Sequence, residues 1–432
     1  MRYPPYLEDD IVLPDFYKVR AKYPSTKIEY ISKLKKELTA VYRNIKIKKN
    51  DKVAVCVGSR GISDLPEIVK TVCTFISDKG GVPFIVPAMG SHGGATADGQ
   101  VEVLEKLGVS EDTCGVQIKS SLDVDKIGKV FGEVPVYFSK DCMDADHSIC
   151  INRIKSHTKF KGKIESGLLK MICVGMGKHL GAMTYHNMAL KYGFQELLIK
   201  MGRSAVEKSN IRFGVAIVEN SYDEIMEIKA IEASDIFESE KDLLKIAKRN
   251  LPNLPVNDLD ALIIDQIGKE ISGAGMDPNV TGRTFDYMED DFSKELNAKR
   301  VAVLNLTDKT GGNAIGVGNA DIITEKVFEK MNYEATLMNA LTSMSLRKAF
   351  IPVKVRDDMM AIKTALLTTG PYNPNDAKVI LIKDTKHLDC FIISSELKKE
   401  FSGTGFEIEK TRLVFDNENN LTNFQGGIKT SS

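Results

Sequence analysis

The chain of 432 residues contains no tryptophan, and aromatic residues make up only 7% of it. Basic and acidic side chains balance at 59 each, which leaves no global field to attract nucleic acid or an anionic membrane. No apolar run approaches the roughly 20 residues of a membrane span. The first ten residues lack the basic-then-apolar plan of a secretory signal, so we expect a cytoplasmic protein.

Cysteine is sparse. The seven cysteines are odd in number, widely spaced and without a CxxC pair. This spacing argues against a zinc ribbon and against a disulfide framework. We therefore expect small buried thiols in a reducing compartment.

Strands and helices are expected to alternate from about residue 50 onward. β-branched runs are followed by short loops and then by apolar residues at helical spacing. Such units favour an α/β fold with mostly parallel sheets flanked by helices. The expected strands are 52–57, 82–86, 148–151, 211–218, 227–231, 261–265 and 301–305, and the expected helices include 65–77, 166–174, 184–201 and 233–249.

A linker is expected at 250–255, where two prolines in Asn-Leu-Pro-Asn-Leu-Pro interrupt helix and sheet alike. It divides the chain into an N-terminal α/β domain, 1–255, and a C-terminal α/β domain, 256–420. The polar residues 421–432 are expected to form a flexible tail. The active site is expected in the cleft between the two domains.

Arg60 and His92 lie in loops that follow successive expected strands. The planar donor fork of Arg60 suits a carboxylate or phosphate, although a surface ion pair would explain it equally well. His92 lies in Gly90-Ser91-His92-Gly93-Gly94, where glycines would let the backbone approach a ligand, or would merely form a tight turn. Because loops after the carboxyl ends of parallel strands meet, the two side chains could converge.

The segment 152–186 is the richest in chemistry. It holds three of the six histidines, and Lys170 lies there within an apolar run. A lysine in such a run either extends to water or is held for chemistry, because burial of an unpaired ammonium is costly. Several glycines between Lys170 and His186 could turn the backbone and bring this histidine over the lysine, a role for which His179 competes.

Gln266 and Lys269 follow the expected strand 261–265 and could face a cleft, although a solvated loop is an equal explanation. None of the glycine stretches fits a P-loop or a dinucleotide fingerprint. A nucleotide enzyme of standard type is therefore poorly supported.

Several short patterns together resemble the nickel-dependent lactate racemase family, which also contains other 2-hydroxyacid racemases and epimerases. The patterns are M-G-S-H-G-G, S-H-x-x-F-x-G, S-G-x-x-K, the later His186, and D-Q-x-x-K, in this order over most of the chain. The resemblance implies a nickel-pincer nucleotide, a pyridinium mononucleotide with two sulfur-bearing arms that hold nickel. It also implies cofactor-biosynthesis proteins as partners.

The resemblance also implies residue roles. Lys170 would carry the cofactor through a thioamide, and His186 would bind nickel. His92 and His157 would act as the acid/base pair, while Arg60, Gln266 and Lys269 would bind the substrate.

The reaction implied is inversion of C2 in a 2-hydroxyacid. Hydride leaves and returns while a histidine takes and gives back the hydroxyl proton. The resemblance implies lactate or a related 2-hydroxyacid as the expected substrate, and the long loop after Lys269 leaves a larger, more polar acid such as a sugar acid open. Two alternatives stay open: a two-domain protein that binds small carboxylates without catalysis, and a zinc hydrolase that uses His157, His179 and His186.

Overall fold

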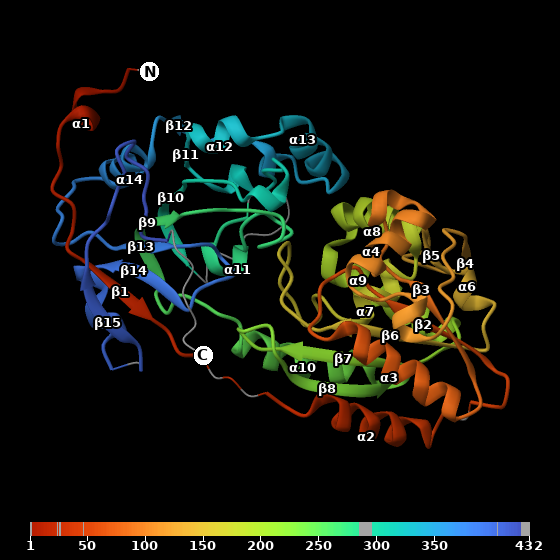
Figure 1. Ribbon diagram of the computed structural model, residues 1–432. Coiled ribbons are helices and arrows are strands. Elements are labelled where there is room, and N and C mark those ends of the chain that lie inside the picture. Colours follow the sequence, from red (N-terminus) through yellow and green to blue (C-terminus); the bar gives the residue numbers. More distant parts are fainter. Residues whose placement is uncertain are drawn as a thin grey trace. The chain divides into compact units, whose positions relative to one another are not determined.

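A computed structural model describes residues 2–23, 25, 27–45, 47–284, 296–403 and 405–424. The chain forms two compact units (Figure 1). Unit 1 combines Met1–Tyr23 with Pro252–Ser432, and unit 2 is Pro24–Leu251. Both units are α/β, and in the main sheet of each unit the parallel strand pairs outnumber the antiparallel ones, so the expected fold class is confirmed.

Unit 2 is built on a five-stranded sheet of order β3-β2-β6-β7-β8. The first four strands are parallel, and only β8 runs antiparallel to its neighbour. A separate antiparallel hairpin joins β4 to β5. The strands are β2 (Lys52–Val57), β3 (Val82–Pro87), β4 (Val124–Val130), β5 (Val134–Ser139), β6 (His147–Arg153), β7 (Ile211–Glu219) and β8 (Ile225–Glu232).

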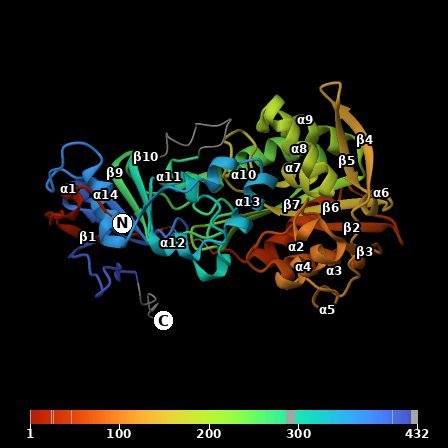
Figure 2. The same ribbon diagram turned by 90° about the horizontal axis from the view of Figure 1, so that it is seen from above.

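Helices cover both faces of this sheet (Figures 1 and 2). One face packs against α2 and α3 in a core of branched apolar side chains. On the other face Leu168 of α7 fits against Gly214, where a β-carbon would collide with it. The helices are α2 (Tyr30–Tyr42), α3 (Leu65–Asp78), α4 (Ala97–Lys106), α5 (Glu111–Cys114), α6 (Lys140–Met143), α7 (Leu168–Lys170), α8 (Lys178–Tyr192), α9 (Phe194–Lys208) and α10 (Ile236–Arg249).

Unit 1 is built on an eight-stranded mixed sheet of order β12-β11-β10-β9-β13-β14-β1-β15 within the described residues. In β9, Ala261 and Ile263 face the core around α14, whereas Leu262 and Ile264 face the opposite core. The strands are β1 (Phe16–Arg20), β9 (Asp258–Ile264), β10 (Asn297–Val303), β11 (Ile322–Thr324), β12 (Val353–Val355), β13 (Val379–Ile382), β14 (Cys390–Ser394) and β15 (Glu407–Thr411), and the helices are α1 (Pro5–Glu8), α11 (Pro278–Thr281), α12 (Glu325–Lys330), α13 (Tyr333–Thr342), α14 (Asp358–Leu367) and α15 (Lys398–Phe401).

The domain boundaries differ from the expected ones at the start of the chain. The first 23 residues do not join the N-terminal domain 1–255, because β1 pairs antiparallel with both β14 and β15. Leu421, expected to begin the tail, is buried, and its backbone N–H donates to Asp358 Oδ2 at 2.8 Å. Residues 425–432 lie outside the described part of the chain.

Two expected helices also differ from the structure. The helix expected at 184–201 is divided into α8 and α9 at Gly193, whose φ of 79° lies in the left-handed region that favours glycine. The helix expected at 166–174 begins as α7 and continues as a π-helical turn, Met171–Gly175. Within the described residues, we find no helix both long and apolar enough to cross a bilayer.

Candidate functional site

Three neighbouring parallel strands of unit 2 end at the same edge of the sheet. Arg60 follows β2, His92 follows β3 and His157 follows β6. These strands lie side by side in the order β3-β2-β6. The fold therefore brings to one edge three loops that are far apart in sequence, as loops after parallel strands predict.

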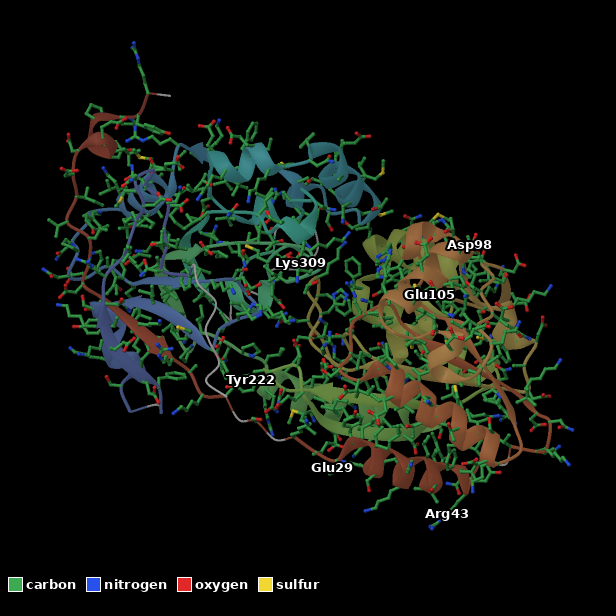
Figure 3. All side chains as sticks on the ribbon, viewed as in Figure 1. Glu29, Arg43, Asp98, Glu105, Tyr222 and Lys309 are labelled. Carbon is green, nitrogen blue, oxygen red and sulfur yellow. The ribbon has the colours of Figure 1, made fainter. Side chains whose placement is uncertain are left out.

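The loop that carries His92 is held by two buried polar side chains. Gln100 lies on the buried face of α4, opposite the exposed Asp98 and Glu105 (Figure 3), and its amide nitrogen donates to Gly90 O at 2.8 Å. Lys178, at the start of α8, is fully buried and donates to Pro87 O at 2.7 Å. A backbone bond from Gly90 N to Gly175 O, 3.2 Å long, joins the loop to the π-helical turn.

Lys170 is paired with His157. The lysine Nζ lies 2.5 Å from His157 Nε2, and its side chain is half-buried. Because Lys159 N–H donates to His157 Nδ1 at 3.0 Å, that nitrogen carries the lone pair. A neutral His157 is then protonated at Nε2 and donates to a neutral lysine amine, a tautomer that we assign from the hydrogen bonds.

The electrostatic surroundings favour a neutral Lys170. Loss of hydration lowers the pKa of its amine to about 7. The positive charges of Arg60, Lys155 and Lys159 act in the same direction, so these cations lie close to the amine. An uncharged lysine is a nucleophile, and the surrounding cations would attract an anionic ligand.

His186 is also kept neutral. Burial, followed by the positive charges of Lys159 and Lys170, lowers the pKa of its imidazole to about 3, and His92 contributes in the same direction. Its Nδ1 atom is buried and accepts or donates no hydrogen bond within the described residues. A buried ring nitrogen without a partner is costly, and a neutral imidazole is the form that binds a metal ion.

His92 and Arg60 complete the cluster. The Ser59 hydroxyl is hydrogen-bonded to His92 Nδ1, and since a hydroxyl either donates or accepts, this bond permits both tautomers of the imidazole. Arg60 is exposed at the surface. Partial loss of hydration and the charge of the nearby Arg153 lower the pKa of its guanidinium.

Sequence reasoning missed the buried carboxylate of Glu165, which folds the loop after β6 onto itself. Its Oε2 accepts His157 N–H at 2.7 Å, and its Oε1 accepts Gly162 N–H at 2.9 Å. Lys248 of α10 neutralises it at 2.6 Å. The only sequence signal was an acid next to the apolar Ile164, which did not reveal these partners.

Gln266 and Lys269 lie in unit 1, at the carboxyl end of β9. Gln266 N–H donates to Lys383 O at 3.0 Å, and Lys269 N–H donates to Thr310 Oγ1 at 3.2 Å. Their backbone is thus fixed in the loop that the sequence predicted. Their contact with substrate, and an active site in a cleft between domains, stay predictions.

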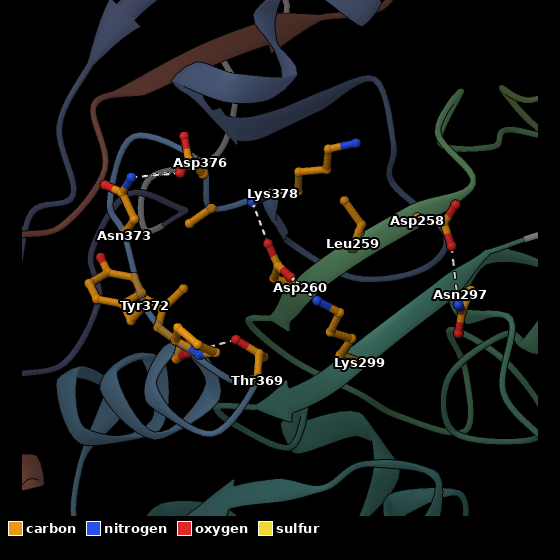
Figure 4. A pocket seen from close by; sticks show the side chains of 13 residues that line it. Asp258, Leu259, Asp260, Asn297, Lys299, Thr369, Tyr372, Asn373, Asp376 and Lys378 are labelled. Atoms are coloured by element: carbon orange, nitrogen blue, oxygen red, sulfur yellow. Dashed lines mark hydrogen bonds and ion pairs between the residues drawn. The ribbon is translucent and has the colours of Figure 1, made fainter.

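A cavity of about 440 Å³ lies at the opposite, amino-terminal end of the parallel strands of unit 1 (Figure 4). Its polar groups pair with one another: Asp260 accepts from Lys299 Nζ at 2.7 Å and from Lys378 N–H at 2.9 Å. None of the predicted site residues lines it.

Within the described residues, the zinc alternative has no set of ligands. His179 is exposed on α8, whereas His157 is bonded to Lys170. No group of three histidine, cysteine, aspartate or glutamate side chains in the described part of the chain could hold a metal ion. A site with several protein ligands, as structural and hydrolytic zinc requires, is therefore not supported.

Comparison with known proteins gives few matches. Residues 57–235 match the family described as a domain of unknown function, DUF362. No curated protein matches the chain. Among solved structures, the chain is similar to the lactate racemase apoprotein from Thermoanaerobacterium thermosaccharolyticum, with 13% sequence identity, a TM-score of 0.48, and coverage of 83% of this chain and 94% of that chain.

Proposed function

We propose that the protein is a 2-hydroxyacid racemase or epimerase that uses a nickel-pincer nucleotide bound to Lys170. The observation that carries the proposal is the contact between the Lys170 amine and the His157 imidazole in the neighbourhood of several cations. The amine of Lys170, with a pKa of about 7, lies 2.5 Å from His157. Nδ1 of His186, which has no partner in the described part of the chain, belongs to the same electrostatic cluster. The sequence patterns that resemble the lactate racemase family assign the same residues.

The residues fit such a group. A neutral amine is required for Lys170 to form a covalent bond to a carbonyl carbon. A neutral imidazole with an unsatisfied nitrogen is required for His186 to bind nickel, which prefers nitrogen and sulfur donors. When bound, the cofactor would supply a hydride acceptor. The cations Arg60, Lys155 and Lys159 suit the negative groups of cofactor and substrate.

The protein would supply orientation and proton transfer. Arg60 would bind the substrate carboxylate through its planar fork, which fixes the orientation of C2. His92, held by Ser59, would take or give the hydroxyl proton, because its bond to a hydroxyl permits either tautomer. His157 would act on the other enantiomer once its Nε2 no longer bonds to the Lys170 amine. Covalent modification of that amine removes its basicity and so frees the imidazole.

The test is an intact mass spectrum of protein from a host supplied with the cofactor-biosynthesis enzymes, with peptide mapping and nickel analysis. We expect one adduct, on Lys170, and about one nickel per chain, as a site with one histidine ligand requires. Lys170→Ala should lose the adduct, and His186→Ala should lose nickel. His179→Ala, exposed on the same helix as His186, is the matched control and should retain both.

Two results would contradict the proposal. An adduct that persists in Lys170→Ala would overturn the attachment site. Wild-type protein without adduct or nickel that binds 2-hydroxyacids tightly and does not isomerise them would instead support the carboxylate-binding protein.

A further inference from the structure

Glu240 of α10 is a fully buried carboxyl group that the proposed chemistry does not use. Its Oε2 accepts the backbone N–H of Leu169 at 2.8 Å. Leu169 is the second residue of α7, whose first N–H groups have no carbonyl partner within the helix. Glu240 therefore satisfies the start of the helix whose last residue is Lys170.

The absence of a side chain at Gly167 leaves room for the carboxyl group of Glu240. A β-carbon at Gly167 would collide with Glu240 Oε1 and would lie 2.6 Å from Ile154 Cδ1. The Gly167 carbonyl accepts Asn152 Nδ2–H at 2.7 Å. The glycine that precedes α7 is thus required by the approach of Glu240, which gives a physical reason for the Ser-Gly-x-x-Lys pattern.

The carboxyl group is costly to the fold. Burial raises the pKa of Glu240 to about 7. The N–H groups of Leu169 and Leu168 act in the opposite direction, because they favour the charged form. Its Oε1 has no hydrogen-bond partner within the described residues. An unsatisfied buried oxygen lowers stability, and an apolar side chain of similar size would avoid that cost. Such features concentrate at functional sites.

We propose that Glu240 is a positioning residue, which fixes the first turn of α7 and thereby holds the amine of Lys170 against His157 in a dehydrated setting. Lys170 directly follows Leu169, so a shift of the Leu169 peptide moves the amine with it. The inference rests on the proposed function only for its consequence in catalysis. The effect of Glu240 on the position and hydration of the Lys170 amine is expected in the protein without cofactor as well.

The experiment is competitive acetylation of the folded protein without cofactor by limiting acetic anhydride, from pH 5.5 to 9.5, with Lys170 modification measured by peptide mass spectrometry. In the wild type, labelling should be half-maximal near pH 7, the pKa of the amine. Glu240→Ala should raise this midpoint by about one pH unit or more, because a released amine is hydrated again. At pH 7 a rise of one unit reduces the neutral amine roughly fivefold.

Two variants separate positioning from general loosening. Glu240→Gln keeps an acceptor for Leu169 N–H, and its midpoint should stay within about half a pH unit of the wild type. Glu238→Gln removes a carboxylate from the exposed part of the same helix, next to Lys241, and should leave the midpoint unchanged. A change in the accessibility of Lys170 alone would alter the yield of acetylation but not the pH of its midpoint.

A folded Glu240→Ala protein with an unchanged midpoint overturns the inference. If that variant does not fold, Glu240→Asp, whose carboxylate is one methylene shorter, is measured in the same way. Its midpoint should move in the same direction, and an unchanged midpoint overturns the inference equally. Because no cofactor is present, this failure is distinct from failure of the proposed function.

Discussion

His186 is the site residue whose state makes the sharpest prediction. Burial and neighbouring cations lower the pKa of its imidazole from 6.5 to about 3. An unfolded chain takes up a proton at this histidine below pH 6.5, and the folded protein does not. The folded state therefore loses stability as the pH falls from about 6.5 toward 3.

The size of this loss follows from the two pKa values. Each unit of pH below 6.5 costs about 1.4 kcal/mol until the folded pKa is reached. Between pH 7.5 and pH 5 the loss assigned to His186 is about 2 kcal/mol. Asparagine does not titrate, so His186→Asn should lose about 2 kcal/mol less than the wild type over this interval.

Urea unfolding of both proteins without cofactor, at pH 7.5 and pH 5, measures the difference. Any packing defect in His186→Asn is present at both pH values and cancels, as do the contributions of other titrating groups. His179→Asn, at the exposed histidine of α8, should behave like the wild type. Equal losses in the wild type and His186→Asn would refute the reasoning, because they would mean that His186 is hydrated and protonates normally.

Three further predictions concern stability. Lys178→Ala removes a fully buried amine that donates to Pro87 O, and it leaves a cavity. Urea unfolding should show that the free energy of unfolding falls by about 2 kcal/mol, and a change below about 0.5 kcal/mol would contradict the role of this bond. Gly175→Ala places a β-carbon 2.5 Å from Ala88 O and should lower the melting temperature by several degrees. Gly61→Ala, whose β-carbon has no atom within 4 Å, should leave the melting temperature unchanged. Similar melting temperatures in the two variants would show that the loop after β3 moves without cost. Burial raises the pKa of Glu240 from 4.5 to about 7, so the wild type loses stability as the pH rises through that window. Between pH 5 and pH 8, Glu240→Gln should therefore gain about 2.5 kcal/mol relative to the wild type in urea unfolding, and a constant difference would contradict the raised pKa.

Part of the arrangement of the candidate site could be predicted from the sequence because it depends on local patterns. Buried strands read as β-branched runs, and glycines mark the loops that follow them. Since parallel strands present their carboxyl ends at one edge, the sequence predicted that the Arg60 and His92 loops could converge. The strand order, which the sequence did not predict, adds the His157 loop to the same edge. Lys170 was identified from its apolar neighbours.

The remaining features depend on contacts distant in sequence. Glu165 and Glu240 read as ordinary acids, and only their backbone N–H partners show why each is buried. The pairing of β1 with β14 and β15 has no local signal, because sheet partners can lie anywhere in the chain. The break at Gly193 was missed because the apolar spacing continues through it.

Unit 1 is formed by the two ends of the chain, and the sequence of unit 2 lies between them. This order has a consequence for synthesis on the ribosome. Asp15, just before β1, and Lys410 of β15 form an ion pair across a sequence separation of 395 residues. At roughly 5–20 residues per second, the first strand emerges on the order of 20–80 s before its last partner. Unit 2, whose residues are contiguous, is complete in sequence during this delay. Nascent chains should therefore show a protease-resistant unit 2 while the N-terminal strand is still open to cleavage and to chaperones.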